Sequence, residues 1–360
     1  MSQALSLIMA IGLVFGGLAW LFDKESRYGK SFEQAINLMG PLVLSMVGLI
    51  CLAPVFSYYL GPVVGPFFRW IGVDPALFGG LLPLDMGGYQ IAMELADTPY
   101  IGAYAGIVVG AIFGTTVVFT IPLSIGVLLR GERGLFFQGV AYGLVAMPAG
   151  LILGALMSGL TVGETMRQNL PIFALCLLLF VLMRKKPLSV AKLFDRLASV
   201  VRVIGLIGLL LACVAYLLDV ELVSRMSSLG EGAAIVVSIT VYLMGSLPLS
   251  ELLYQVLRAP IARLASVLQV NDYSVLGLLV GTISVVPGIM MMKNMDPKGK
   301  VLNAAYVVSA ASAMSAHLAF TMAVEPKLVP ALLVSKIVGG GVALLLAFVM
   351  ERRKADAERS

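Results

Sequence analysis

Long stretches without a single charged residue recur along almost the whole chain. Six of them contain no Asp, Glu, Lys or Arg: 34–68, 98–129, 134–163, 203–218, 273–292 and 301–316. A helix needs about 20 apolar residues to cross the hydrocarbon core of a membrane, and several of these stretches are longer. Inside a bilayer the backbone must satisfy its own hydrogen bonds, so only helices or a closed barrel can form. The period-two alternation of a barrel is absent. The sequence therefore predicts an all-α polytopic membrane protein.

The overall composition agrees with this prediction. Charged residues make up 12% of the chain and apolar residues 59%, whereas a soluble domain carries about 25% charged residues. The 38 glycines and 17 prolines are spread through the apolar stretches, a pattern typical of closely packed and partly broken membrane helices. The net charge of +5 does not imply nucleic acid, because the basic residues lie between apolar stretches, where they set orientation.

The apolar stretches fall into nine continuous spans and two interrupted segments. We predict spans near 4–22, 36–59, 100–129, 135–160, 169–183, 203–218, 232–256, 300–323 and 328–350. The stretches near 75–93 and 273–292 are instead interrupted by proline and glycine, among them Pro83, Gly87 and Pro287. Such interruption favours discontinuous or re-entrant segments over straight spans. The number of membrane spans is nine if both interrupted segments return to the side they entered, and eleven if both segments cross the membrane.

The basic residues predict an orientation. The densest group of Lys and Arg lies at 184–202, and another lies in the C-terminal tail at 352–354. With nine spans, every basic cluster falls on the same side, which the positive-inside rule makes cytoplasmic. We therefore expect a multi-pass protein of a bacterial inner membrane, with its N-terminus outside and its C-terminus inside.

The two interrupted segments belong to an internal repeat. Pro54 matches Pro248 at an offset of 194 residues, Asp74 matches Asn271 at 197, and Met93 matches Met292 at 199. An odd number of spans between the copies predicts that the second is inserted upside down, as in many transporters. Four regions follow: a first repeat at 1–183 with an extra helix near 169–183, a basic cytoplasmic linker at 184–202, an inverted repeat at 203–350, and a cytoplasmic tail at 351–360.

Several blocks resemble the ethanolamine utilisation transporter family of the EutH type. The clearest are LPLDMGGYQIAMELA at 82–96 and MMKNMDPKGKVLNAAYVVSAASAMSAHLAF at 291–320. Further blocks lie at 52–55, 61–62, 110–126 and 336–340, and their order is kept from about residue 30 to 350. The resemblance implies a permease that imports ethanolamine as a carbon and nitrogen source, acting as a secondary carrier or facilitator.

The chain also departs from the family pattern. Thr115 stands where relatives carry proline, Ser284-Val285 where they carry adjacent asparagines, and Ala316 where they carry aspartate before the histidine. Asparagine and aspartate side chains can hold an amine or a hydroxyl. A carrier of another small amine or amino alcohol therefore stays open as an alternative.

Asp85 is the first candidate for substrate contact. An ionised carboxylate within an apolar segment is costly unless it is paired, and ethanolamine is an ammonium at neutral pH. Asp85 is a suitable counter-charge, Tyr89 offers a cation–π face, and Gly87 and Gly88 let the backbone approach a ligand. The alternative is that Asp85 caps the half-helix that follows it.

We predict that substrate lies between the Asp85–Tyr89 turn and the Ser284–Gly288 turn. The expected site comprises Asp85, Met86, Gly87, Gly88, Tyr89, Ser284, Pro287, Gly288, Ser312, His317 and Lys336. Lys336 either pairs permanently with an acid such as Asp85 or Glu251, or yields that acid to the substrate. His317 is either a cavity residue or a hydrogen-bonded packing residue.

Other classes of function find less support. The chain contains no GxxxxGK[ST] motif, and its single histidine without HExxH argues against an intramembrane enzyme. A purely structural membrane subunit would not need Asp85 and Lys336 at membrane depth. We expect no cofactor, no metal and no nucleic acid; the expected partners are ethanolamine and the lipid bilayer, and a homo-oligomer stays open.

Overall fold

The computed structural model describes residues 2–82, 85–129 and 131–359, and within them it does not place the side chains of Asp85, 257–263 and a few terminal positions. Every regular element in these ranges is a helix, so the predicted all-α class is confirmed. The first half contains α1 (Ser2–Phe22), α2 (Arg27–Asn37), α3 (Met39–Leu42), η1 (Val43–Val47), α4 (Gly48–Trp70), α5 (Ala76–Leu81), η2 (Asp85–Gly87), α6 (Gly88–Leu95), α7 (Pro99–Ala103), η3 (Tyr104–Gly114), η4 (Thr116–Thr120), α8 (Ile121–Val127), α9 (Arg133–Met157) and α10 (Val162–Lys185). The second half contains α11 (Pro187–Leu218), α12 (Leu229–Leu268), α13 (Asp272–Ile283), α14 (Val285–Met290), η5 (Met291–Asn294), α15 (Pro297–Ala310), α16 (Ala316–Val324), η6 (Pro326–Leu328) and α17 (Val329–Arg359).

Seven helices in the described part of the chain are long and apolar enough to cross a membrane. They are Arg27–Trp70, Pro99–Val127, Arg133–Met157, Val162–Lys185, Pro187–Leu218, Leu229–Val256 and Pro326–Lys354. Two predicted spans fall outside this set. The one near 4–22 forms α1, a shorter apolar helix, and the one near 300–323 is divided between α15 and α16. Residues 187–202, predicted as part of a linker, form the first half of α11.

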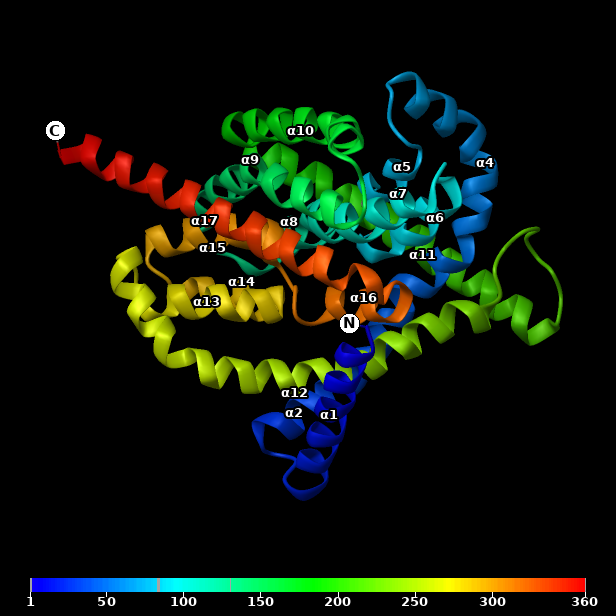
Figure 1. Ribbon diagram of the computed structural model, residues 1–360, viewed down its shortest axis with the longest axis horizontal. Coiled ribbons are helices and arrows are strands. Elements are labelled where there is room, and N and C mark those ends of the chain that lie inside the picture. Colours follow the sequence, from blue (N-terminus) through cyan, green and yellow to red (C-terminus); the bar gives the residue numbers. More distant parts are fainter. Residues whose placement is uncertain (1, 83–84, 130, 360) are drawn as a thin grey trace.

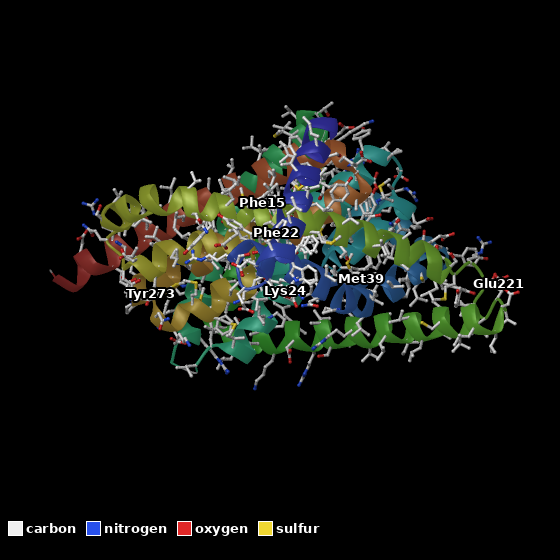
Figure 2. The ribbon with its side chains drawn as sticks, turned by 90° about the horizontal axis from the view of Figure 1, so that it is seen from below. Phe15, Phe22, Lys24, Met39, Glu221 and Tyr273 are labelled. Carbon is white, nitrogen blue, oxygen red and sulfur yellow. The ribbon has the colours of Figure 1, made fainter. Side chains whose placement is uncertain are left out.

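The N-terminal helices project from the rest of the bundle. α1 and α2 form an antiparallel pair that extends beyond α12 at the lower edge of Figure 1. The outer face of α1 is apolar, and Phe22 at its end is 83% exposed. Figure 2 shows Phe15 and Phe22 on this arm, near Lys24. An apolar face of this kind matches a lipid environment, because hydrocarbon rather than water covers it.

Two helix crossings in the periphery rely on glycine. α1 crosses α12 where Gly12 meets the carbonyl oxygen of Gly245, and α11 crosses α4 where Gly208 meets the carbonyl oxygen of Gly48. In both places a Cβ atom would collide with the backbone of the facing helix. Small residues at such crossings let membrane helices approach closely, which increases their dispersion contacts.

α9, α15 and α17 form the centre of the bundle and pack extensively on one another (Figure 1). Gly150 of α9 lies directly on the backbone of Ser335 in α17, whose hydroxyl donates to the Gly150 carbonyl at 2.8 Å. Gly139 and Gly143 bring α9 equally close to α15. These contacts fix a rigid scaffold against which the broken helices lie.

Both interrupted segments return to the place where they begin. The amide of Asp97, after α6, donates to the carboxylate of Asp74, before α5, at 3.2 Å. In the second segment the side chain of Asn271, before α13, donates to the carbonyl of Asn294 at 2.9 Å. The Ser274 hydroxyl also donates to Asp296 at 2.6 Å. Each segment is therefore a closed hairpin with a bend at its far end.

The chain from 297 to 324 is broken at 311–315. Ser312 has a φ of 52°, and its amide donates to the carbonyl of Gly281 at 3.0 Å, while the amide of Met314 donates to the carbonyl of Thr282 at 3.1 Å. These partners are the last carbonyls of α13, which its own helix leaves unsatisfied. The break thus exists because tertiary hydrogen bonds replace those of a continuous helix.

Candidate functional site

A cavity of about 580 Å³ lies where the broken elements meet. Its walls come from α2–η1, the η2 turn, the η4–α8 region, α11, α12, α14 and the 312–317 segment. Most of the lining is apolar. The hydroxyl, amide and ring groups among the lining residues are those of Gln34, Ser45, Thr115, Ser284, Ser312, Ser315 and His317. A mostly apolar cavity with a few converging polar groups is the usual form of a small-molecule site.

Five of the predicted site residues line this cavity together: Met86, Gly87, Ser284, Ser312 and His317. They come from two interrupted segments and one broken helix, which are far apart in the sequence. The side chain of Asp85 lies outside the described residues, although its backbone begins the η2 turn beside Met86 and Gly87. The two predicted turns therefore face the same cavity.

The other predicted residues lie behind or beside the cavity wall. Tyr89 is 7% exposed and packs edge-on against Phe320, with ring centroids 5.7 Å apart, and Phe320 itself lines the cavity. Gly88 begins α6 and packs against Gly79. Gly288 packs against Gly281 of α13. Pro287 lines a smaller neighbouring pocket.

His317 is held at both ring nitrogens. Nδ1 lies 3.0 Å from the carbonyl oxygen of Ala311, and Nε2 lies 3.1 Å from Oγ1 of Thr115. A carbonyl can only accept, so the neutral ring carries its proton on Nδ1, and this assignment follows from the hydrogen-bond network. Nε2 is then an acceptor for the Thr115 hydroxyl, which also lies 3.3 Å from the Gly110 carbonyl. The imidazole edge is thereby fixed in the cavity wall.

The bend at Ser284 and the helix break at 311–315 are joined to each other. The amide of Val285 donates to the Ser312 hydroxyl at 3.3 Å, and the Ser315 hydroxyl donates to the carbonyl of Ile283. The bend between α13 and α14 and the break between α15 and α16 consequently form one hydrogen-bonded unit. Sequence reasoning missed Thr115 and Ser315 as parts of the site; hydroxyl residues within apolar stretches were the available signal.

Lys336 is fully buried in α17. Its ammonium donates to the carbonyl oxygen of Ala111 in η3 at 2.7 Å and to that of Ser309 in α15 at 3.0 Å. Its side chain is not among those that line the cavity. Glu251, one of the acids considered as its partner, lies elsewhere and forms an ion pair with Arg27 at 4.0 Å. Lys336 therefore connects two helices of the scaffold that surrounds the site.

Charged side chains mark one end of the cavity. Asp195 and Arg202 of α11 both belong to its lining, and both are exposed. Asp195 is the acidic residue among the described side chains that line the cavity. The cavity thus extends from the buried His317 to the surface beside the basic half of α11.

A bundle of apolar helices with two hairpin-like broken segments and a partly polar internal cavity is the arrangement expected of a membrane transporter. The family description "Ethanolamine utilisation protein, EutH" matches residues 1–350. The chain belongs to this family, as its sequence blocks predicted. Relatives in this family are named as probable permeases, and the family assignment bears out the prediction of a transporter rather than an enzyme.

Three relatives cover nearly the whole chain. The "Probable ethanolamine permease EutH" of Listeria monocytogenes is 32% identical over 347 residues, 96% of this chain and 93% of the relative. The protein of the same name from Salmonella typhimurium is 32% identical over 365 residues, with 93% and 90% covered. YxeR of Bacillus subtilis is 30% identical over 348 residues, with 96% and 94% covered. No solved structure matches the chain.

Proposed function

We propose that the protein imports ethanolamine across the bacterial inner membrane as a secondary carrier or facilitator. The central cavity carries this assignment: it lies at the meeting point of the broken segments and combines hydroxyls, an imidazole and an apolar wall. The names of the relatives supply the substrate. An amine with a hydroxyl needs hydrogen-bond partners at membrane depth, because neither group can rest unpaired in hydrocarbon.

In the proposed complex the ammonium group of the substrate lies against the η2 turn. Asp85 provides the counter-charge, and the glycine at 87 lets the substrate approach the backbone. The hydroxyl of the substrate faces the opposite wall, where Ser284, Ser312 and His317 line the cavity. Tyr89 supports the wall through Phe320.

We further propose that the two halves are inverted repeats with nine spans and two re-entrant segments. Three relationships support this. The order of elements from α4 to α9 resembles that from α12 to α17, with a broken hairpin in second place in each. α1 crosses α12 at Gly12 and Gly245, and α11 crosses α4 at Gly208 and Gly48. The equivalent residues of the two crossings are Gly12 and Gly208, which are 196 apart in the sequence, and Gly48 and Gly245, which are 197 apart. Lys336 bridges Ala111 and Ser309, which are 198 apart.

The proposed division of the chain follows from these offsets. The repeats are 1–183 and 203–350, joined by 184–202 and followed by the tail 351–360. The N-terminus faces outward and the C-terminus inward, because the basic clusters then lie in the cytoplasm. With this orientation we expect the cavity to open toward the cytoplasm, since the exposed residues Asp195 and Arg202 belong to its lining.

A second candidate is a carrier of a different small amine or amino alcohol. The four departures from the family pattern described above, Thr115, Ser284, Val285 and Ala316, line the cavity. Departures in the wall of a site favour a change of substrate, because function depends on the residues of the site rather than on the fold. Thr115 and Ala316 moreover adjoin His317, the former by a direct contact.

Uptake by proteoliposomes tests both candidates. Purified protein would be reconstituted and given labelled ethanolamine, with choline, ethylamine and 2-aminopropanol as unlabelled competitors. Saturable uptake that unlabelled ethanolamine inhibits best supports the first proposal. Strong inhibition by another amine, with slow uptake of ethanolamine, supports the second. Uptake equal to that of empty liposomes for every amine would contradict both.

A further inference from the structure

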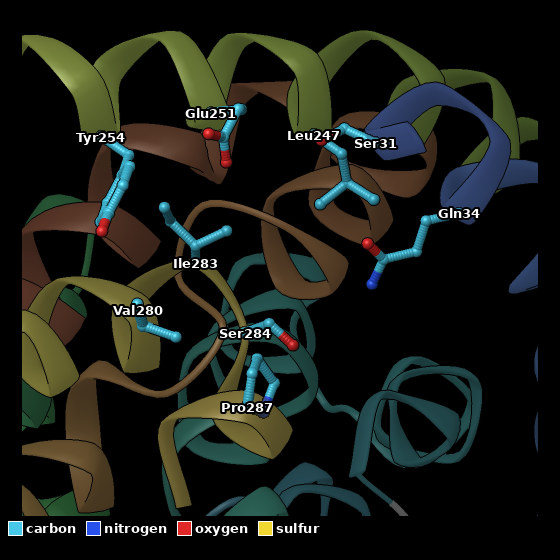
Figure 3. Close-up of a pocket in the computed structure, with 9 residues that line it drawn as sticks. All are labelled: Ser31, Gln34, Leu247, Glu251, Tyr254, Val280, Ile283, Ser284 and Pro287. Carbon is cyan, nitrogen blue, oxygen red and sulfur yellow. The ribbon is translucent and has the colours of Figure 1, made fainter. Parts of the chain in front are cut away.

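A second pocket adjoins the central cavity and has a different chemistry. Its volume is about 170 Å³, and its walls come from α2, α12 and the α13–α14 bend. Figure 3 shows the residues that line it: Ser31, Gln34, Leu247, Glu251, Tyr254, Val280, Ile283, Ser284 and Pro287. Gln34, Leu247 and Ser284 also line the central cavity, so the two spaces are neighbours with a shared wall.

The polar groups of this pocket are arranged on opposite walls. In Figure 3 the carboxylate of Glu251 points from α12 into the pocket, while the amide of Gln34 and the hydroxyl of Ser284 lie across from it. One wall therefore carries a negative charge, and the other carries neutral donors and acceptors. A small molecule with an ammonium at one end and a hydroxyl at the other fits this arrangement.

Glu251 retains the capacity to bind a cation. Its Oε1 lies 4.0 Å from Nη1 of Arg27, at the outer limit of an ion pair, and the Arg27 side chain is 65% exposed. An exposed pair at that distance contributes little. A carboxylate accepts about four hydrogen bonds, and the Glu251 side chain itself is only 26% exposed. An ammonium that enters the pocket would meet a carboxylate partly shielded from water, where their attraction is stronger than at the surface.

We infer that this pocket is a second binding site for a small hydroxylated ammonium ion, on the path between the central cavity and the surface near α2. Glu251 holds the ammonium group, and Gln34 and Ser284 hold the hydroxyl. The inference rests on the proposed function, because the ligand is the transported amine. Since Ser284 lies in the wall of both spaces, it can contact the substrate in either one.

Binding measurements on purified protein in detergent test this site. Labelled ethanolamine would be titrated against wild type, Glu251→Gln and Arg27→Gln, with Glu33→Gln as a matched control on the exposed face of α2. We expect wild type to bind at two sites and Glu251→Gln to lose about tenfold or more in affinity at one of them. Arg27→Gln should keep that affinity or increase it, because it removes the competing cation. Glu33→Gln should bind as wild type.

Two results would overturn the inference while leaving the transport function intact. One is wild-type binding in Glu251→Gln. The other is an equal loss in Glu251→Gln and Arg27→Gln, which would make the pair purely structural. Gln34→Met offers a second variant in the same pocket and should lower the preference for ethanolamine over ethylamine at this site, because it removes an amide assigned to the substrate hydroxyl. Absence of both binding and uptake in wild type would instead contradict the proposed function itself.

Discussion

Nε2 of His317 lies 3.1 Å from Oγ1 of Thr115, and this contact joins the start of α16 to the junction of η3 and η4. Both residues are buried, and both line the central cavity. The ring and the hydroxyl therefore shape the site and also stabilise the packing of two broken helices. The two roles can be separated by mutation.

Thr115→Val removes the hydroxyl with little change in volume. Leaving a buried ring nitrogen without this donor is expected to cost about 1–3 kcal/mol of stability. Thermal unfolding of the detergent-solubilised protein, followed by circular dichroism, measures this cost. Combined with His317→Leu, the double variant should lose less than the sum of the single losses, by about 0.5–3 kcal/mol.

Thr120→Val is a matched control for that prediction. The Thr120 hydroxyl is buried, and no hydrogen-bond partner for it lies within the described part of the chain. Its removal should leave stability unchanged or increase it. Strict additivity of Thr115→Val and His317→Leu would show that the two side chains do not interact.

Asp85→Asn preserves the shape of the side chain and removes its charge. If Asp85 holds the ammonium group, the change should cost about 1.5–3 kcal/mol, the scale of a hydrogen bond to a charged group. This corresponds to about tenfold or more in apparent affinity, measured as uptake at limiting ethanolamine. Glu94→Gln, on the exposed side of α6, should have a much smaller effect. Normal uptake by correctly inserted Asp85→Asn protein would show that Asp85 is a helix cap.

Gly48→Ala places a methyl group against the carbonyl oxygen of Gly205, where α4 crosses α11. The helices must separate to admit it, so we expect a loss of about 1–3 kcal/mol in stability. Gly245→Ala should act similarly at the crossing of α12 with α1. At Gly40 a Cβ would meet no atom within 4 Å, so Gly40→Ala should be neutral or stabilising. Unfolding temperatures that do not distinguish these variants would exclude a close approach at the crossings.

The two ends of α11 test the orientation. Ser189 is exposed near its start, and Glu221 is exposed just after its end (Figure 2). In a background without the three native cysteines, Ser189→Cys should react with an impermeant maleimide only after the cells are permeabilised. Glu221→Cys should react in intact cells. The opposite pattern would invert the topology.

The sequence predicted the helices because apolar stretches of this length have few alternatives in a bilayer. It also located the bend at 85–87 and the bend at 284, because proline and glycine within apolar segments mark them. The break at 311–315 could not be predicted in the same way. Alanine, serine and methionine occupy that segment, and none of them breaks a helix strongly. The break depends on hydrogen bonds to Gly281 and Thr282, which only the tertiary structure supplies.

The sequence also predicted some of the residues that line the central cavity. Met86, Gly87, Ser284, Ser312 and His317 line the cavity, as expected for residues at interruptions of the helices. Lys336 was expected to line the same space; its ammonium donates to two backbone carbonyls, and its side chain is not among those that line the cavity. Spacing along a helix tells at which depth a lysine lies, but the direction of its side chain depends on neighbouring helices.

Lys336 bears on the motion that we expect if the protein carries its substrate by opening alternately to two sides. Its ammonium holds a carbonyl of η3 and a carbonyl of α15 at once, and losing each bond from a charged donor costs about 1.5–3 kcal/mol. A movement that pulled these two helices apart would break both bonds in a buried part of the bundle, where water cannot replace them. Motions that keep η3 and α15 together at Lys336 are therefore the cheapest, and we expect the bundle to move least around this residue.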